Sequence, residues 1–348
     1  MKGMELARRY WDEAGRPAFE RYCPQVLAYS AVGLAGEGSE CFGYDDALSR
    51  DHDWGPGFCL WMTQEGWERY GAEAGKIYDG LPQEFLGFRT ERMDPRAAGR
   101  TGPMQIRTFY GSFLGRAIPP QSNMQWMFLA DPNLAAATNG VVFMDQAAEF
   151  SRIRTQLLDY YPEDVRRKKL AAHLALAAQA GQYNFPRCSA RGESIAAFLS
   201  LEQFISHTQA VVFLLNRRYR PYYKWTQRMM RTLPVLGACT ADGLEDILAV
   251  IGTDPAKGRE HGTKEARGGV RDESGQGIRP DERSYRSEKQ DAIQERIEQI
   301  CADIAGELIR QKMTACKSNY LLDHAVCLQQ KIKDHEIRNL HLMMTGEY

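Results

Sequence analysis

The chain has 348 residues, of which 43% are hydrophobic and 26% are charged. This length suffices for two ordinary domains, and this composition is typical of a globular protein with a sizeable core. The formal net charge of −1 gives no general attraction to nucleic acid or to an anionic membrane, which disfavours both as partners without ruling out nucleic acid.

The sequence also bears on location and redox state. No apolar run approaches the roughly 18 residues that a membrane-spanning helix needs. The first residues, "MKGMELARRYWDEAGRP", lack the apolar core and cleavage site of a signal peptide. None of the eight cysteines forms a C-x-x-C pair, which argues against a zinc knuckle. We therefore expect a cytoplasmic protein with reduced cysteines.

Short strands and helices alternate in the first 150 residues. Apolar periodicity predicts a helix over 4–30, interrupted near Gly15 and Pro17, and a second helix over 64–79. Strand character marks "AYSAVGLAG", "FCLWM", the start of "MQIRTFYGSFLG" and "VVFMD", the last after a turn at Asn139-Gly140. These patterns predict an α+β domain over residues 1–150.

From residue 151 to the end the periodicity is helical, which is typical of a helical bundle domain over 151–348. Residues 253–286 differ, because they are rich in Gly and charged residues and almost free of apolar ones. Such a segment cannot bury enough surface to offset the entropy of ordering, so we predict a mobile loop. A final helical stretch over 287–345 carries isoleucines and leucines at spacings of three and four.

The stretch "GEGSECFGYDDALSRDHDW" holds the most informative spacing. Gly38 permits a tight turn with close backbone approach, and Ser39 would open a short helix whose N–H groups and hydroxyl could hold a phosphate. Asp51 and Asp53 are two residues apart, so on a strand both carboxylates would share one face and could bind Mg²⁺. Mn²⁺ is possible in the same place. The simpler interpretation is a turn followed by a solvated acidic loop.

This arrangement resembles the nucleotidyltransferase superfamily, which has the polymerase-β-like fold. The residues that match its motif are Gly38, Ser39, Gly43, Asp51 and Asp53. More closely, the chain is similar to a bacterial domain-of-unknown-function family, number 4037, assigned to this superfamily. That resemblance is carried by "GEGSECFGYDDALSRDHDWGPGF", "LLDYYPEDV", "LLNRRYRPYYKW" and "KDHEIRNLHLM".

The resemblance implies a small mixed β-sheet in the first domain and magnesium-dependent transfer of a nucleoside monophosphate. The donor would be an NTP, first of all ATP, and the acceptor a hydroxyl or amine, first of all of a small molecule. Gly38 and Ser39 would hold the phosphate, and Asp51 and Asp53 the metal. The family has no settled activity.

Two departures support a rival, in which a degenerate member binds nucleotide or a partner without turnover. The residues "WGPG" after Asp53 interrupt the expected strand, since Pro56 cannot donate to a sheet. The third carboxylate of many active relatives is also missing, because the corresponding strand offers Arg107, with Asp145 and Glu91 as substitutes. A metal-dependent phosphohydrolase is a third, weaker hypothesis.

Cations in the second half are candidate nucleotide ligands. Arg187 and Arg191 are four residues apart, so on a helix two guanidinium groups could clamp a triphosphate, or else form a structural ion-pair face. Lys224 is a further phosphate ligand by resemblance, because similar enzymes often use lysines of the helical domain. The sequence does not select a general base, an oligomeric state or the preferred base of the nucleotide.

Overall fold

The computed structural model describes residues 1–51, 54–89, 100–252 and 280–347, and for residues 50, 51 and 280–287 it describes the backbone alone. The chain divides into two compact units, each built from separate stretches of sequence. The first contains Met1–Pro162, Tyr219–Trp225 and Gly346–Tyr348, and the second contains Glu163–Arg218 and Thr226–Thr345.

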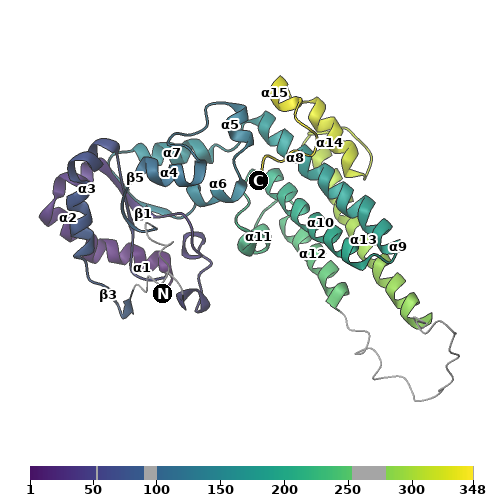
Figure 1. The fold of residues 1–348 in the computed structure, drawn as a ribbon, viewed down its shortest axis with the longest axis horizontal. Coiled ribbons are helices and arrows are strands. Elements are labelled where there is room, and N and C mark those ends of the chain that lie inside the picture. The colour runs from purple at the N-terminus through teal and green to yellow at the C-terminus, as the bar shows by residue number, and fades with distance from the viewer. Residues whose placement is uncertain (52–53, 90–99, 253–279, 348) are drawn as a thin grey trace, which may run out of the picture. The chain divides into compact units, whose positions relative to one another are not determined.

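The first unit is built around a four-stranded mixed sheet (Figure 1). Its strands are β1 (Ser30–Leu34), β2 (Cys59–Met62), β5 (Gly102–Gln105) and β6 (Val141–Asp145), in the order β5-β2-β1-β6. Strand β1 is antiparallel to β2 and β6, and β2 is parallel to β5. Two short strands, β3 (Glu84–Phe85) and β4 (Phe88–Arg89), pair separately as a hairpin.

The first unit also contains the helices α1 (Gly3–Tyr10), α2 (Arg16–Tyr22), α3 (Gln64–Asp79), α4 (Ile106–Leu114), α5 (Asn123–Met127), α6 (Asp131–Thr138) and α7 (Glu149–Leu158). Helices α1, α3, α4 and α7 pack against the sheet. A π-helical segment, Trp11–Gly15, joins α1 to α2, so the predicted interruption near Gly15 and Pro17 is present. A mixed four-stranded sheet together with these helices confirms the predicted α+β class.

Strand β2 is fully buried because both of its faces are covered. Phe58, which precedes it, and Leu60 and Met62 on one face belong to a cluster with Trp11 and Phe19. On the other face the Trp61 ring stacks on Phe150 of α7, with ring centroids 3.9 Å apart. This alternation is the two-residue period of a strand, and it fixes which helices lie on which side.

Helix α7 lies in the first unit, whereas the sequence predicts a domain boundary near residue 150. The physical reason is that α7 continues past this boundary with its side chains Ile153 and Leu157 buried, and packs against α6, β1 and β6 of the same unit. Two later stretches also belong to this unit. The Tyr219 hydroxyl donates to the Leu157 carbonyl over 2.6 Å, and Arg220 pairs with Glu347 at 3.0 Å.

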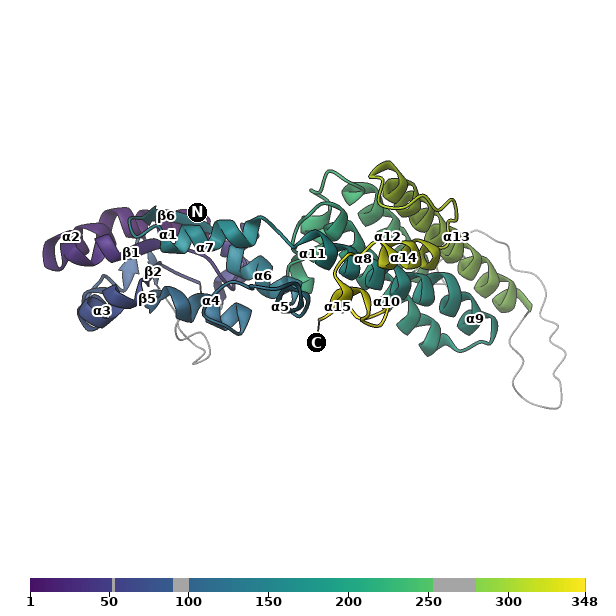
Figure 2. The ribbon, with the colours of Figure 1, turned by 90° about the horizontal axis from the view of Figure 1, so that it is seen from above.

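The described secondary structure of the second unit is entirely helical (Figures 1 and 2). Its helices are α8 (Glu163–Ala177), a π-helical segment (Ala178–Asn184), α9 (Phe185–Ala190), α10 (Ser194–Leu215), α12 (Gly237–Gly252), α13 (Pro280–Arg310), α14 (Leu321–Gln330) and α15 (His335–Arg338). Helix α11 (Tyr223–Met230) gives its first residues to the first unit and the rest to the second.

Helix α8 is the central element of this unit, since it packs against both α10 and α14. Even its lysines are buried: Lys168 and Lys169 are 0% exposed. Their ammonium groups satisfy backbone carbonyls near the end of the chain. Lys168 donates to His341 and Leu342 over 2.9 and 2.8 Å, and Lys169 to Thr345 over 3.1 Å. Buried charge is tolerated only with such partners.

Part of the predicted mobile loop over 253–286 is wrong. Helix α13 already begins at Pro280, and proline suits the first turn of a helix because its missing N–H would have no partner there. The rest of the predicted loop, 253–279, lies outside the described residues. Further along α13, Ile293, Ile297 and Ile300 are buried at the predicted helical spacing.

Among the described residues, one helix is long and apolar enough to cross a membrane by length and composition alone. It is α10, with a mean hydropathy of 1.2 over an 18-residue window, half of which is buried inside the structure. The core helix of a globular protein passes the same test, so this finding is weak evidence for a membrane span. The sequence shows no apolar run of this length, because polar residues interrupt the helix. None of the eight cysteines forms a disulfide in the structure.

Candidate functional site

The loop after β1 has a backbone conformation that glycine favours. Gly36 and Gly38 have φ angles of +113° and +116°, in the left-handed region. The Asn139 side chain holds one end of the loop, because its Oδ1 accepts the Gly36 N–H over 2.8 Å and its Nδ2 donates to the Gly36 carbonyl over 2.7 Å. The predicted turn at Asn139-Gly140 therefore also fixes the Gly-Ser loop.

Ser39 lies where this loop turns into a short 3-10 segment, Glu40–Phe42. Its carbonyl accepts the N–H groups of Phe42 and Tyr44, over 3.2 and 2.9 Å. Within the described residues, its hydroxyl and the N–H groups of Gly38 and Ser39 have no hydrogen-bond partner. The loop therefore presents free donors of the kind that bind a phosphate oxygen.

An arginine that the sequence analysis overlooked lies against this loop. The Arg100 Nη2 donates to the Glu37 carbonyl over 2.7 Å and to Glu40 Oε1 over 2.8 Å. A side chain at Gly38 would overlap this guanidinium group, which is a second reason for glycine there. Burial raises the pKa of the Glu40 carboxyl, although the neighbouring Arg100 lowers it. The site thus holds one cation beside the free donors.

Asp51 does not lie on a strand, contrary to the prediction. It ends a 3-10 turn, Leu48–Asp51, and β2 begins only at Cys59. The turn starts at Asp46, whose carboxylate accepts the N–H groups of Leu48 and Ser49 over 3.0 and 3.1 Å. These bonds, chiefly the one from Ser49, lower the pKa of Asp46. Asp53 and the side chain of Asp51 lie outside the described residues, so their shared metal stays a prediction.

The segment that carries Asp51 and Asp53 is anchored by a buried carboxylate, Asp45, which is 2% exposed. Its Oδ2 accepts the Gly3 N–H over 2.7 Å and the Trp54 Nε1–H over 3.3 Å, and its Oδ1 lies 3.7 Å from Lys2 Nζ. Asp45 precedes the segment and Trp54 follows it. This carboxylate therefore ties both ends to the start of α1.

The described strands supply no third carboxylate at this place. Strands β2 and β5, with the sequences CLWM and GPMQ, contain no acid. Asp145 ends β6, but its two oxygens accept the N–H groups of Ala148 and Ser151, over 2.7 and 2.8 Å, at the start of α7. Glu91, the other substitute, lies outside the described residues.

The predicted cationic ligands fall into different units. Lys224 is exposed in the first unit, next to Trp225, whose ring centroid lies 5.6 Å from that of Tyr44. Arg187 and Arg191 are exposed in the second unit, on α9 and directly after it. The Arg187 guanidinium lies 4.7 Å from the centre of the Tyr183 ring.

The alternative ion-pair face for Arg187 and Arg191 is not formed within the described residues. Neither guanidinium has a carboxylate partner there, and Glu163 pairs with Arg166, Arg167 and Arg217 instead. Both therefore stay available as anion ligands.

The chemistry of the predicted ligands suits magnesium, since Asp51 and Asp53 offer carboxylate oxygens, the hard donors this ion prefers. In the part of the chain with described side chains, no group of three or more His, Cys, Asp or Glu residues could hold a metal. That search did not include the two predicted ligands, so it leaves the magnesium prediction untested.

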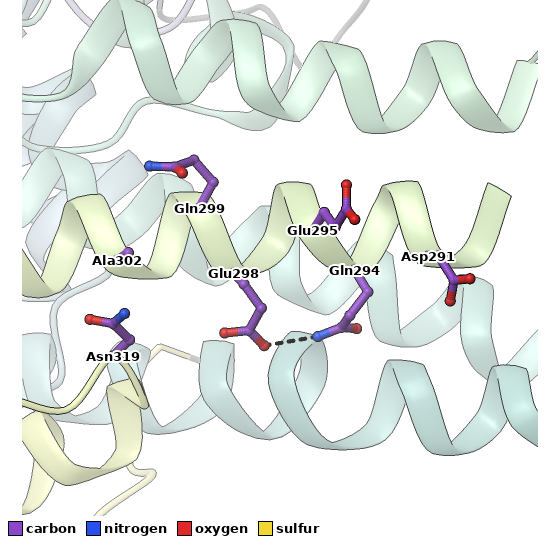
Figure 3. Close-up of a pocket in the computed structure, with 7 residues that line it drawn as sticks. All are labelled: Asp291, Gln294, Glu295, Glu298, Gln299, Ala302 and Asn319. Carbon is purple, nitrogen blue, oxygen red and sulfur yellow. Dashed lines mark hydrogen bonds between the residues drawn. The ribbon is translucent and has the colours of Figure 1, made fainter. Parts of the chain in front are cut away.

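A hollow of about 610 Å³ lies on the second unit and is lined by acidic residues (Figure 3). Figure 3 shows Asp291, Glu295 and Glu298 projecting from α13. The Glu298 oxygens accept amide N–H groups from Gln182 and Gln294, each over 2.8 Å. Negative charge repels a nucleotide, and the bond from Gln182 connects the π-helical segment Ala178–Asn184 to α13, so we assign the cluster a structural role.

The fold places the chain in the α+β class, and comparison with known proteins adds a family match. Residues 126–226 match the model of a domain of unknown function (DUF4037). The matched family is the one predicted from the sequence. The matched segment runs from α5 to the start of α11. No curated protein and no solved structure matches the chain.

Proposed function

We propose that the protein is a metal-dependent nucleotidyltransferase, which moves a nucleoside monophosphate from an NTP to an acceptor. The observation that carries this proposal is the Gly-Ser loop after β1, with the free N–H groups of Gly38 and Ser39, the free Ser39 hydroxyl and the adjacent Arg100. The loop that bears Asp51 and Asp53 connects this site to β2, the antiparallel neighbour of β1.

In this proposal each residue has a distinct role. Gly38 and Ser39 donate hydrogen bonds to the triphosphate, and Arg100 offsets part of its charge. Asp51 and Asp53 hold Mg²⁺, or Mn²⁺ in its place. The bound metal would polarise the α-phosphate and neutralise the leaving pyrophosphate. Lys224, Arg187 and Arg191 are further proposed nucleotide ligands.

The reaction forms a bond between an acceptor oxygen or nitrogen and the α-phosphorus, and it breaks the bond from that phosphorus to pyrophosphate. The acceptor proton passes to a base that we do not assign. We propose ATP as the donor, a small hydroxylated or amino compound as the acceptor, and the cytoplasm as the location. The net charge of −1 disfavours a large RNA acceptor.

The alternative is a degenerate protein of this fold that binds nucleotide or a partner without turnover. Two observations favour it. Strand β2 starts well after Asp53, following Gly55-Pro56-Gly57, and the carboxylate of Asp145 is used at the start of α7. Turnover needs metal and both aspartates, whereas binding alone does not, so the two candidates differ in a measurable way.

The test is calorimetric titration of a non-hydrolysable ATP analogue, with and without magnesium. The variants are Asp51→Asn/Asp53→Asn and a control, Asp12→Asn/Glu13→Gln. The control also removes two carboxylates from the first unit, where they form exposed ion pairs with Arg8 and Arg9.

We expect magnesium-dependent binding by the wild type and the control, and its loss in Asp51→Asn/Asp53→Asn. That result would justify a screen of acceptors for pyrophosphate release. Binding that ignores both magnesium and the aspartates would favour the degenerate protein. If the folded wild type binds no analogue of the four NTPs, the nucleotide site does not exist and partner identification comes next.

A further inference from the structure

A cluster of cations surrounds a hollow of about 270 Å³ in the second unit. The charged side chains that line it are Glu163, Arg166, Arg167, Arg217, Lys312 and Lys331. They come from the start of α8 and from the ends of α10, α13 and α14. Five cations thus face a single carboxylate, and Asp164 beside the hollow adds one more negative charge through its pair with Arg167.

Some of these cations have structural partners. Arg166 Nε donates to the Leu214 carbonyl at the end of α10 over 2.9 Å, and Lys331 Nζ donates to the Met313 carbonyl over 2.8 Å. Cations are favourable at helix C-termini, where carbonyls lack partners, so these two need no ligand to explain them.

The remaining cations are not explained in this way. Arg217 makes one ion pair, with Glu163 at 2.7 Å, and Lys312 has no partner among the described residues. Glu163 also lies 3.3 Å from Arg166 and 3.4 Å from Arg167. One carboxylate is therefore shared by three guanidinium groups, which leaves positive charge in surplus. The position of the Glu163 carboxylate among these guanidinium groups shows that the hollow stabilises a negative charge.

The backbone at Arg217 and Lys312 supports a role for these two side chains. Both have positive φ angles, +51° and +58°, at the position after a helix where glycine is usual. The N–H groups of Lys312 and Met313 close the end of α13 on Ile309 and Leu308. Arginine and lysine are strained there, so helix termination does not explain their presence.

We propose that this hollow binds a small phosphorylated anion. Arginine forks and a lysine from separate helices match the several oxygens of a phosphate, and the surplus charge matches a dianion. The volume lies slightly below the range of pockets that hold drug-sized ligands, which favours inorganic phosphate or a small phosphate monoester over a nucleotide. This inference does not depend on the proposed nucleotidyltransferase activity.

The test measures binding of inorganic phosphate and of glycerol 2-phosphate by calorimetry at low ionic strength. The variants are Arg217→Gly and Lys312→Gly, because glycine suits both backbone positions and the helices should still fold. Lys317→Gly is the control, since it removes an exposed lysine that does not line the hollow.

We expect the wild type to bind at least one probe, and Arg217→Gly and Lys312→Gly to weaken binding about threefold to tenfold each. The control should bind as the wild type does. Tighter binding of glycerol 2-phosphate than of phosphate would identify an organic phosphate as the ligand, and the reverse would identify the free ion.

Glu163→Gln separates a binding site from a structural ion-pair cluster. It removes the carboxylate that competes with the ligand, so we expect phosphate to bind more tightly by a similar factor. The proposal fails if the wild type binds neither probe at millimolar concentration or if Arg217→Gly and Lys312→Gly bind normally. Unchanged or weaker binding in Glu163→Gln would likewise contradict the proposal, because Glu163 would then not compete with the ligand.

Discussion

A single glycine determines how closely the chain before β6 approaches the end of β1. Gly140 has a φ angle of +67°, and a Cβ built on it would overlap the Leu34 carbonyl oxygen and crowd the Ala35 Cα. Gly43, in the same unit, has a φ angle of +72° but no atom within 4 Å of such a Cβ. Comparing substitutions at these two glycines therefore separates the cost of backbone strain from the cost of steric overlap.

We predict that Gly140→Ala lowers the free energy of unfolding by about 3 kcal/mol, since it adds overlap with backbone to the left-handed strain. Gly43→Ala should cost only the strain, about 1 kcal/mol. Urea unfolding followed by circular dichroism measures both. Equal costs for the two variants would show that the Leu34 carbonyl moves aside readily.

Replacing Arg217 or Lys312 by glycine should change the free energy of unfolding in the opposite direction. Because each occupies a left-handed position, Arg217→Gly and Lys312→Gly should each raise the free energy of unfolding by roughly 0.5–1 kcal/mol. Arg217 also loses its ion pair with Glu163, which is half-exposed and weak. Thermal unfolding in phosphate-free buffer measures the change. A loss of stability in both variants would show that the side chains serve the fold.

At the scale of elements, α7 is held at its first turn by the buried side chain of Phe150. Phe150 is 0% exposed and stacks on Trp61, whereas Leu158 at the other end of the helix is 45% exposed. We predict that Phe150→Ala costs about 3–5 kcal/mol and Leu158→Ala less than about 1 kcal/mol. Chemical unfolding measures both. Similar costs for the two would mean that α7 is not held by the Trp61 face of the sheet.

Local patterns account for the elements that the sequence predicts correctly. Strands at Ser30–Leu34, Cys59–Met62 and Val141–Asp145, and the helix Gln64–Asp79, follow apolar runs and periodicity contained in the elements themselves. The turn that ends at Asp51 depends on the Asp46 side chain, a detail that periodicity does not contain.

The candidate site was predicted only in part for the same reason. Gly38 and Ser39 form a recognisable motif, and the structure places them on a loop with free donors. Arg100 reaches Glu40 across 60 residues of sequence, and Asp45 reaches Gly3 across 42, so no local spacing reveals either contact. The positions of the Asp51 and Asp53 carboxylates stay a prediction.

At the scale of the whole molecule, pH should affect stability through a buried lysine. Burial lowers the pKa of Lys168 from 10.5 to about 8. Between these values the unfolded chain binds more protons than the folded chain, so the free energy of unfolding rises with pH across this window. Below about pH 8 the lysine is charged in both states and the full penalty of burying that charge applies.

We predict that raising the pH from about 8 to 10.5 stabilises the wild type relative to Lys168→Met by no more than about 3 kcal/mol. Lys317→Met, in which an exposed lysine is replaced, should change in parallel with the wild type. Denaturant unfolding at a series of pH values measures the difference. A parallel pH dependence of the wild type and Lys168→Met would contradict a lowered pKa for this lysine.

The first unit is assembled from three separate stretches of sequence, and this has a consequence for protein synthesis. The Leu157 carbonyl accepts a hydrogen bond from Tyr219, and the Asp131 carboxylate accepts one from the Arg220 N–H. Arg220 in turn pairs with Glu347. Ribosomes release the N-terminus first, so the sheet emerges long before its last partners. The nascent first unit must therefore stay incomplete until almost the whole chain has been translated, and a fragment ending at Pro162 would lack these contacts permanently.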